Sequence, residues 1–217
     1  MNKIKYINFL TPLVRSARRL GIIPASPLIN DRAIEYGFMA RELDFQRGQR
    51  ILDVGFLESP CAFIFSGLGA EVYALDLRSC PIKYPNLKSV VGDIRKTDFE
   101  DKFFDRIVAI STIEHLGIST RYGSYEDLDA DKKAMQEIKR ILKNDGRIIV
   151  TVPFGKSSIN SVQRTYNLED IKKITEDFEV ISIEYSKNAG SYWTIATHEE
   201  VKDTVGYNAN VMVSLRK

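Results

Sequence analysis

The chain has 217 residues, of which 44% are hydrophobic, and its formal net charge is +2. This length and composition predict one domain of α/β size with a continuous core, and the mild charge argues against a nucleic-acid partner. No apolar stretch reaches the roughly 18 residues that a membrane-spanning helix needs, so we expect no transmembrane segment. Cys61 and Cys80 lack a metal-type spacing and follow no secretory signal, which predicts reduced thiols in a cytoplasmic protein.

Residues 1–30 are predicted to form a helical extension ahead of the main domain, residues 31–217. Apolar residues recur there at helical spacing, with arginines at other positions: Phe9, Leu10, Leu13, Val14, Ala17 and Leu20. Such a helix either covers the sheet or the active-site mouth, or lies at the surface of an anionic membrane. Its apolar face also offers a surface for a homodimer. Pro24 and Pro27 mark a short linker after it.

From residue 32 onward, helical and strand-like patterns alternate. Helices are expected over residues 32–43, 61–68, 129–142 and 168–175, with Gly146 just past the end of the third. Strands are expected over residues 50–54, 71–76, 86–91, 105–110, 147–152, 178–185 and 210–215, the last two as a hairpin-like pair at the sheet edge. Strands that alternate with helices predict an α/β fold, a parallel sheet with helices on both faces.

Three of these apolar runs end in an acid, at Asp53, Asp76 and Asp93. The carboxyl ends of parallel strands meet at one sheet edge, where open α/β sheets bind ligands, so a nucleoside site is predicted. Asp76 follows Asp53 by 76 − 53 = 23 residues, a spacing typical of an acid that binds ribose hydroxyls. Leu57 and Ser59 stand where a dinucleotide site keeps glycines, so the ligand is expected to lack a pyrophosphate.

The chain resembles the class I S-adenosylmethionine-dependent methyltransferases over about residues 30 to 217. The likeness rests on ILDVG (51–55), YALDL (73–77), GDI (92–94), FDRIV (104–108), STIEH (111–115) and ILKNDGR (141–147). It implies a Rossmann-like three-layer sandwich with a seven-stranded, mostly parallel sheet and an antiparallel last strand. It also implies S-adenosylmethionine as cofactor and S-adenosylhomocysteine as product. The first loop departs from the family's Gly-x-Gly, with Phe56, Leu57 and Ser59.

Residues 111–123 and 151–156 are similar to a small-molecule, methyltransferase type 11-like branch associated with surface-polysaccharide pathways. The branch implies transfer to a hydroxyl or phosphate-type oxygen of a sugar or glycan precursor. Two other classes stay open beside it. A non-catalytic binding or scaffold protein is favoured by the altered glycine loop, whereas a nicotinamide-dependent enzyme is disfavoured by the same loop.

The resemblance assigns cofactor roles to the strand-end residues, each beside a structural alternative. Asp53 either receives the amino-acid ammonium or caps the following helix, and Gly55 lets the backbone turn under the ligand. Asp76 accepts from both ribose hydroxyls, and Asp93 with the Ile94 amide reads the adenine edge; a solvated terminus is the alternative for either acid. The remaining candidates contact the adenosine or methionine chain, or belong to the core: Phe56, Leu57, Leu77 and Ser111.

Catalysis centres on Glu114 and His115, which follow the fourth predicted strand. Methyl transfer from a sulfonium requires alignment of the acceptor, and a neutral acceptor must also lose a proton. Imidazole titrates near neutrality, so His115 is the candidate general base, or else it binds substrate or holds its loop. Glu114 either orients His115, binds substrate or caps the neighbouring helix.

The acceptor site is predicted to include Arg121, Tyr122 and Tyr125, because arginine suits an anion and tyrosine offers a flat face to a sugar. Trp193 either forms an acceptor wall or packs in the core. The acids at 127, 129 and 131 lack the glycine and terminal glutamate of a calcium loop, so no metal is predicted, and Asp129 is expected to cap the helix that follows it.

Overall fold

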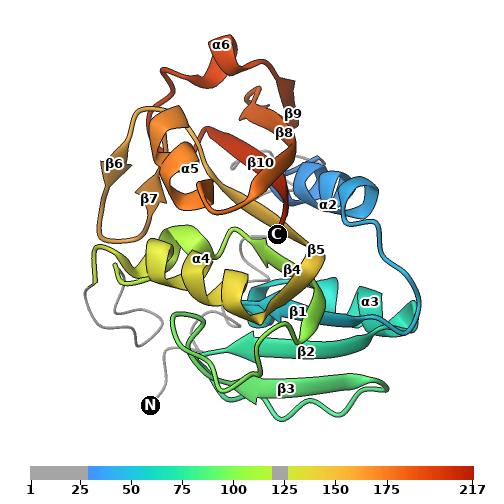
Figure 1. Cartoon of the computed structure of the whole chain (residues 1–217). Helices are drawn as coiled ribbons and strands as arrows, with labels where there is room; N and C mark the ends of the chain where they lie inside the picture. The colour runs from blue at the N-terminus through green and yellow to red at the C-terminus, as the bar shows by residue number, and fades with distance from the viewer. Residues whose placement is uncertain (1–28, 119–126) are drawn as a thin grey trace, which may run out of the picture.

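A computed structural model describes residues 29–118 and 127–217 of the chain. The predicted N-terminal extension therefore lies outside the described residues, apart from Ile29 and Asn30. Three layers are visible, with the sheet between two sets of helices (Figure 1). The predicted Rossmann-like α/β sandwich is confirmed.

The central sheet has eight strands rather than the seven predicted, in the order β3-β2-β1-β4-β5-β10-β8-β9. Their bounds are β1 (Arg50–Val54), β2 (Glu71–Asp76), β3 (Leu87–Val91), β4 (Phe104–Ile110), β5 (Leu142–Pro153), β8 (Glu179–Asn188), β9 (Trp193–Ala196) and β10 (Ala209–Arg216). All seven predicted strands are present, and β9 is the additional one. A separate ribbon pairs β6 (Ser158–Ile159) with β7 (Arg164–Thr165).

The helices divide between the two faces of the sheet (Figure 1). On one face lie α2 (Asp31–Glu42) and α3 (Cys61–Gly67); on the other lie α4 (Ala130–Ile141), α5 (Leu168–Thr175) and the short α6 (His198–Val201). Successive side chains of a strand point to opposite faces, so each central strand supplies both cores. In β1, for example, Ile51 packs under α2 and α3, whereas Leu52 and Val54 belong to the cluster under α4 and α5.

The last strand runs antiparallel, as predicted, but the predicted edge position is wrong. Strand β10 lies between β5 and β8 and is paired antiparallel to both, while β9 forms the edge. The sequence of β10 explains its place, because seven of its eight residues are buried. A strand buried on both faces belongs in a sheet interior, whereas the short β9 exposes Ile195.

Two local predictions around α4 are also corrected. The helix ends at Ile141 and β5 begins directly at Leu142, which pairs with Phe104, so Gly146 lies within β5 rather than at a helix end. Asp129 occupies the N-cap position, but its side chain makes no capping bond; its Oδ1 atom instead accepts from Lys132 Nζ at 2.8 Å. Strand pairing and a surface ion pair thus replace the two expected caps.

The core beneath α4 includes an aromatic cluster around Phe104, which is fully buried. Its ring centroid lies 4.8 Å from that of Phe99, 4.9 Å from that of Phe103 and 5.3 Å from that of Tyr73, each pair meeting edge to face. Such pairs add to the stabilisation from burial alone.

We expect Phe104→Ala to lower the free energy of unfolding by about 3–5 kcal/mol, the usual cost of emptying a buried phenylalanine site. Urea unfolding of the two proteins measures the difference. Val180→Ala is the matched control, because Val180 is 48% exposed, and its change should stay within about 0.5 kcal/mol. A loss below about 1 kcal/mol in Phe104→Ala would contradict the central role of this ring.

Candidate functional site

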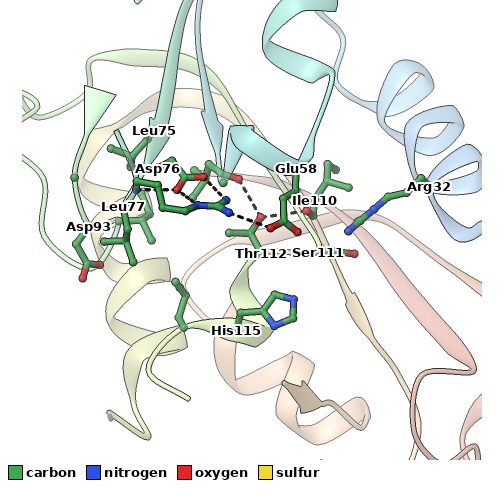
Figure 2. A pocket seen from close by; sticks show the side chains of 16 residues that line it. Arg32, Glu58, Leu75, Asp76, Leu77, Asp93, Ile110, Ser111, Thr112 and His115 are labelled. Carbon is green, nitrogen blue, oxygen red and sulfur yellow. Dashed lines mark hydrogen bonds and ion pairs between the residues drawn. The ribbon is translucent and has the colours of Figure 1, made fainter. Parts of the chain in front are cut away.

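A cavity opens at the carboxyl edge of β1, β2 and β4, with a volume of about 680 Å³ that includes the open solvent at its mouth. Figure 2 shows acids on one side of it, Arg32 on the other, and His115 between them. The cavity therefore lies at the sheet edge where the strand-end acids in the sequence predicted a ligand site.

Seven predicted site residues line this cavity: Gly55, Asp76, Leu77, Asp93, Ile94, Ser111 and His115. Five others are described but are not among its lining residues: Asp53, Phe56, Leu57, Glu114 and Trp193. Arg121, Tyr122 and Tyr125 lie outside the described residues. Several lining residues were not predicted from the sequence, including Arg32, Glu58, Arg78 and Thr112.

Gly55 forms the turn that the sequence predicted after β1. Its φ of 79° is left-handed, and its N–H donates to the Leu75 carbonyl at 2.8 Å. A Cβ atom at this position would lie 2.6 Å from Thr112 Oγ1, so no larger residue fits without a shift. The 3₁₀ turn η1 (Phe56–Glu58) follows, and it buries Phe56 under α2 and α3.

Asp76 ends β2 at the cavity wall, with an arginine bound to its carboxylate. Arg78 donates from Nε to Oδ1 at 2.9 Å and from Nη2 to Oδ2 at 3.0 Å, and the Leu57 N–H approaches Oδ2 at 3.4 Å. Burial opposes ionisation of Asp76, but the bonds from Arg78 outweigh it and hold the pKa below its ordinary value. The carboxylate is therefore charged at neutral pH. Arg78 Nη1 also reaches Glu58 at 3.2 Å (Figure 2).

Asp93 repeats this arrangement after β3. Its Oδ2 atom accepts from Arg95 Nε at 2.9 Å, and its Oδ1 atom accepts from the Arg95 N–H at 2.9 Å. Burial again raises the pKa of Asp93, but the bonds from Arg95 lower it further, so the net shift is downward. Each of the two acids is thus hydrogen-bonded to the arginine that lies two residues after it in the sequence.

Asp53 points away from the cavity. It is fully buried, and its Oδ2 atom accepts from the Ala62 N–H at 2.8 Å, in the first turn of α3. This contact is the helix-capping alternative. Burial raises the pKa of Asp53 to about 8, because the ionised form loses its hydration, although the Ala62 bond opposes the shift.

His115 and Glu114 lie on the 3₁₀ turn η2 (Ile113–His115) after β4. His115 Nδ1 is 2.8 Å from the Val162 carbonyl oxygen, and because a carbonyl only accepts, Nδ1 is the donor in this contact. Glu114 is 1% exposed, with its Oε1 atom 3.7 Å from His115 Nε2. Burial raises the pKa of Glu114 to about 8.

Behind Ser111 lies a fully buried carboxylate that sequence reasoning missed, Glu35 of α2. Its Oε1 atom accepts from Ser111 Oγ at 2.9 Å, Thr151 Oγ1 at 2.8 Å and Asn210 Nδ2 at 3.2 Å. Its Oε2 atom accepts from Arg32 Nη1 at 2.8 Å. An Arg and a Glu three residues apart resemble a surface pair in the sequence, so only the tertiary fold identifies this contact.

Trp193 packs at the start of α2 rather than in the cavity wall. It is 5% exposed, its backbone N–H donates to the Ile29 carbonyl at 2.8 Å, and its ring centroid lies 5.6 Å from that of Tyr207. The core-packing alternative describes this environment.

Within residues 29–118 and 127–217, no three His, Cys, Asp or Glu side chains gather in a group able to hold a metal ion. Over the same residues, no helix is long and apolar enough to cross a membrane.

Comparison with known proteins gives a family match inside the chain. A family model described as a methyltransferase domain matches residues 52–150, which run from β1 to β5 and contain most of the cavity wall. No curated protein sequence matches the chain significantly.

Solved structures share the fold at low sequence identity. A TehB-like methyltransferase from Corynebacterium glutamicum is 21% identical, with a TM-score of 0.57 and complete coverage of both chains. The 1,6-didemethyltoxoflavin-N1-methyltransferase from Burkholderia thailandensis, crystallised with S-adenosylhomocysteine, is 15% identical with a TM-score of 0.57, covering 100% of this chain and 91% of its own. The 4+2 cyclase SpnF is 15% identical with a TM-score of 0.64, covering 98% of this chain and 94% of its own.

The matched segment is the part of the sheet whose carboxyl edge forms the cavity, and its strand-end acids stand where the family resemblance puts a nucleoside cofactor. A methyltransferase-domain family model thus matches the segment that forms most of the cavity wall, and methyltransferases of known structure share the fold of the whole described chain.

Proposed function

We propose that this protein transfers a methyl group to a small-molecule acceptor, at a hydroxyl or phosphate-type oxygen of a sugar or surface-glycan precursor. The observation that carries the proposal is one cavity with the acids of β2 and β3 on one side and the His115 imidazole on another. S-adenosylmethionine, when bound, supplies an electrophilic methyl group. The residues of the chain have to bind it, align the acceptor and take up the acceptor's proton.

The cavity wall has the chemistry that an adenosine moiety requires. Asp76 would accept from the ribose hydroxyls, and Asp93 with the Ile94 amide would bind the adenine edge. Leu77 supplies apolar surface between them, and the Gly55 turn leaves room that a side chain would fill. A ligand hydroxyl at Asp76 has to share the carboxylate with Arg78.

Residues outside the cavity wall support this site indirectly in the proposal. Asp53 holds the start of α3 below the first loop, and the Leu57 N–H ties that loop to Asp76. Phe56 packs the loop against the core. Ser111 lines the wall beside His115, with its hydroxyl bound to Glu35.

In this proposal His115 is the general base. The Val162 carbonyl accepts from Nδ1 and orients the ring, so Nε2 is the nitrogen that would take up the proton of a hydroxyl acceptor. Glu114 lies beside Nε2 without lining the cavity, so its proposed role is to position His115.

A non-catalytic binding or scaffold protein is the second candidate, favoured by the arginines that already bind both acids. The similarity to a cyclase illustrates that this fold alone does not define a reaction. Cofactor binding and turnover distinguish the two candidates.

We also propose that the protein belongs to the surface-polysaccharide branch, is cytoplasmic, forms a homodimer and has no nucleic-acid partner. Its domain organisation is proposed to be a helical extension at residues 1–30 followed by one methyltransferase domain at residues 31–217. Acceptor binding by Arg121, Tyr122 and Tyr125 also belongs to the proposal. Incubation with labelled S-adenosylmethionine and fractionated extracts, followed by identification of the labelled product, tests the acceptor class.

Asp76→Ala is expected to weaken S-adenosylhomocysteine binding by roughly 1.5–3 kcal/mol, the scale of charge-assisted hydrogen bonds. Calorimetric titration measures the affinity. Asp177→Ala is the matched control, since Asp177 pairs with Lys139 at the surface and lies outside the cavity. Unchanged affinity in a folded Asp76→Ala protein would remove Asp76 from the ribose site.

His115→Ala is expected to lower the methylation rate about 10² to 10⁴-fold and to leave cofactor affinity nearly intact, because a base acts on the acceptor. The loss should shrink as pH rises, when the acceptor ionises more readily. The pH profile of kcat/KM with the identified acceptor measures this.

His198→Ala is the control for this experiment, because His198 packs against Phe154 and Tyr185 outside the cavity wall. If the His115→Ala protein keeps the wild-type kcat, and its kcat/KM falls at low pH as in wild type, the imidazole is not the general base. A raised acceptor KM with an unchanged kcat would mark it as a binding residue.

Glu114→Gln is expected to change the pH dependence of stability. The folded pKa of Glu114, about 8, lies above its ordinary value, so ionisation opposes folding and stability falls as pH rises from about 4.5 to about 8. Glutamine never ionises. Relative to wild type, the variant should therefore gain roughly 2–4 kcal/mol between about pH 5 and about pH 8.5.

Urea unfolding of both proteins at the two pH values measures this gain. Asp53 keeps a raised pKa in both proteins, so the comparison isolates Glu114. Glu169→Gln, on the exposed face of α5 with a side chain that is 68% exposed, serves as the control and should show no such trend. Parallel curves for wild type and Glu114→Gln would mean that Glu114 is ionised without penalty.

A further inference from the structure

Arg32 reaches the cavity from α2, on the side away from Asp76 and Asp93 (Figure 2). Its side chain is 28% exposed and lines the wall together with Ser111 and His115. Nothing in the cofactor assignment uses this arginine. It lies on the part of the wall that borders the candidate base.

The guanidinium is held by one nitrogen and leaves others available. Nη1 donates to Glu35 Oε2 at 2.8 Å, and across the described parts of the chain Nε and Nη2 make no hydrogen bond. Glu35 in turn is fixed on its other oxygen by three uncharged donors, from the residue after β4, from β5 and from β10. The bond from Nη1 to Glu35 therefore holds the guanidinium in place, while its other N–H groups can donate to a ligand in the cavity.

The start of α2 is also fixed against the C-terminal part of the sheet. The Trp193 backbone N–H donates to Ile29, and the Tyr207 hydroxyl donates to the Asp31 carboxylate. Asn30 caps the helix, its side chain accepting from the Ala33 N–H at 3.1 Å. Arg32 thus projects from a rigid element, which a specific binding contact needs.

Arg32 presents a permanent positive charge at this part of the cavity wall, with the Glu35 carboxylate behind it. Burial opposes the charged form of Arg32, but Glu35 outweighs it and raises the pKa, so the guanidinium stays a cation. The nearby Glu114 is protonated below about pH 8, since burial raises its pKa to about 8, and adds no negative charge there. The Asp76 carboxylate is compensated by Arg78.

We propose that Arg32 binds an anionic oxygen group, a phosphate or a carboxylate, of the methyl acceptor. Guanidinium donates two parallel hydrogen bonds to either group, and an acceptor held in this way would lie against Ser111 and His115 in the same cavity. The inference rests on the proposed methyl transfer and deepens it: the acceptor is a sugar or glycan precursor that already carries phosphate or carboxylate.

Inorganic phosphate and acetate are the probes for the two anions. Each is titrated into ¹⁵N-labelled protein at constant ionic strength, with and without saturating S-adenosylhomocysteine, and the amide shifts are followed by NMR. We expect saturable binding of at least one anion, with shifts centred on the start of α2 and the end of β4. The stronger of the two identifies the charged group.

Arg32→Gln should weaken that binding at least about tenfold, because one charge-assisted contact contributes roughly 1.5–3 kcal/mol. The glutamine amide can still donate to Glu35, and Arg32→Lys, which keeps the charge but loses the fork, should bind with intermediate affinity. Arg41→Gln is the matched control from the same helix, since Arg41 pairs with Glu42 and Glu184 outside the cavity.

Three results would overturn the inference: no saturable binding of either anion to wild type, equal binding by Arg32→Gln, or an equal loss in Arg41→Gln. If Arg32→Gln unfolds, the comparison of Arg32→Lys with wild type decides, and equal affinity sinks the idea. Failure of wild type to bind S-adenosylhomocysteine would instead contradict the proposed function, whatever the anion titrations show.

Discussion

The buried carboxylate of Glu35 connects the elements that form the inner side of the cavity. A fully buried carboxylate is costly to desolvate and is tolerated only when its oxygens are hydrogen-bonded. Here four side chains meet that requirement, from α2, the residue after β4, β5 and β10. The requirement fixes where α2 lies on the sheet, and with it the place of Arg32. It also fixes the hydroxyl of Ser111, a residue held in a left-handed conformation with φ of 43°.

The sequence predicted what depends on local patterns. Apolar runs that stop at an acid located β1, β2 and the acids at the cavity edge, because a parallel strand places its last residue at the carboxyl side whatever its neighbours are. It could not decide which way Asp53 points. Residue 53 shares its face of β1 with Ile51, which packs beneath α3, so alternation along the strand sends the carboxylate to the helix instead of the cavity.

What escaped prediction depends on long-range packing. Glu35 contacts residues 76, 116 and 175 positions away, and nothing within α2 marks it as buried. The place of β10 between β5 and β8 likewise depends on tertiary packing, because β10 is buried on both faces and so pairs with a strand on each side. Strand β9 has only four residues, too few for an alternating pattern to stand out.

The repeated Asp-x-Arg arrangement changes what a ligand gains at this edge. An exposed strand-end carboxylate would offer its full hydrogen-bonding capacity to a hydroxyl, but Asp76 and Asp93 already receive charged donors from Arg78 and Arg95. A hydroxyl that binds there replaces or shares a charge-assisted bond, so the net gain is smaller than the bond itself. The same arginines keep both acids ionised and correctly oriented before any ligand arrives, which lowers the ordering cost of binding. Affinity at this edge therefore depends on how far each guanidinium can move while its acid stays in place. For Arg78 the Glu58 carboxylate supplies a second partner on the far side of its fork.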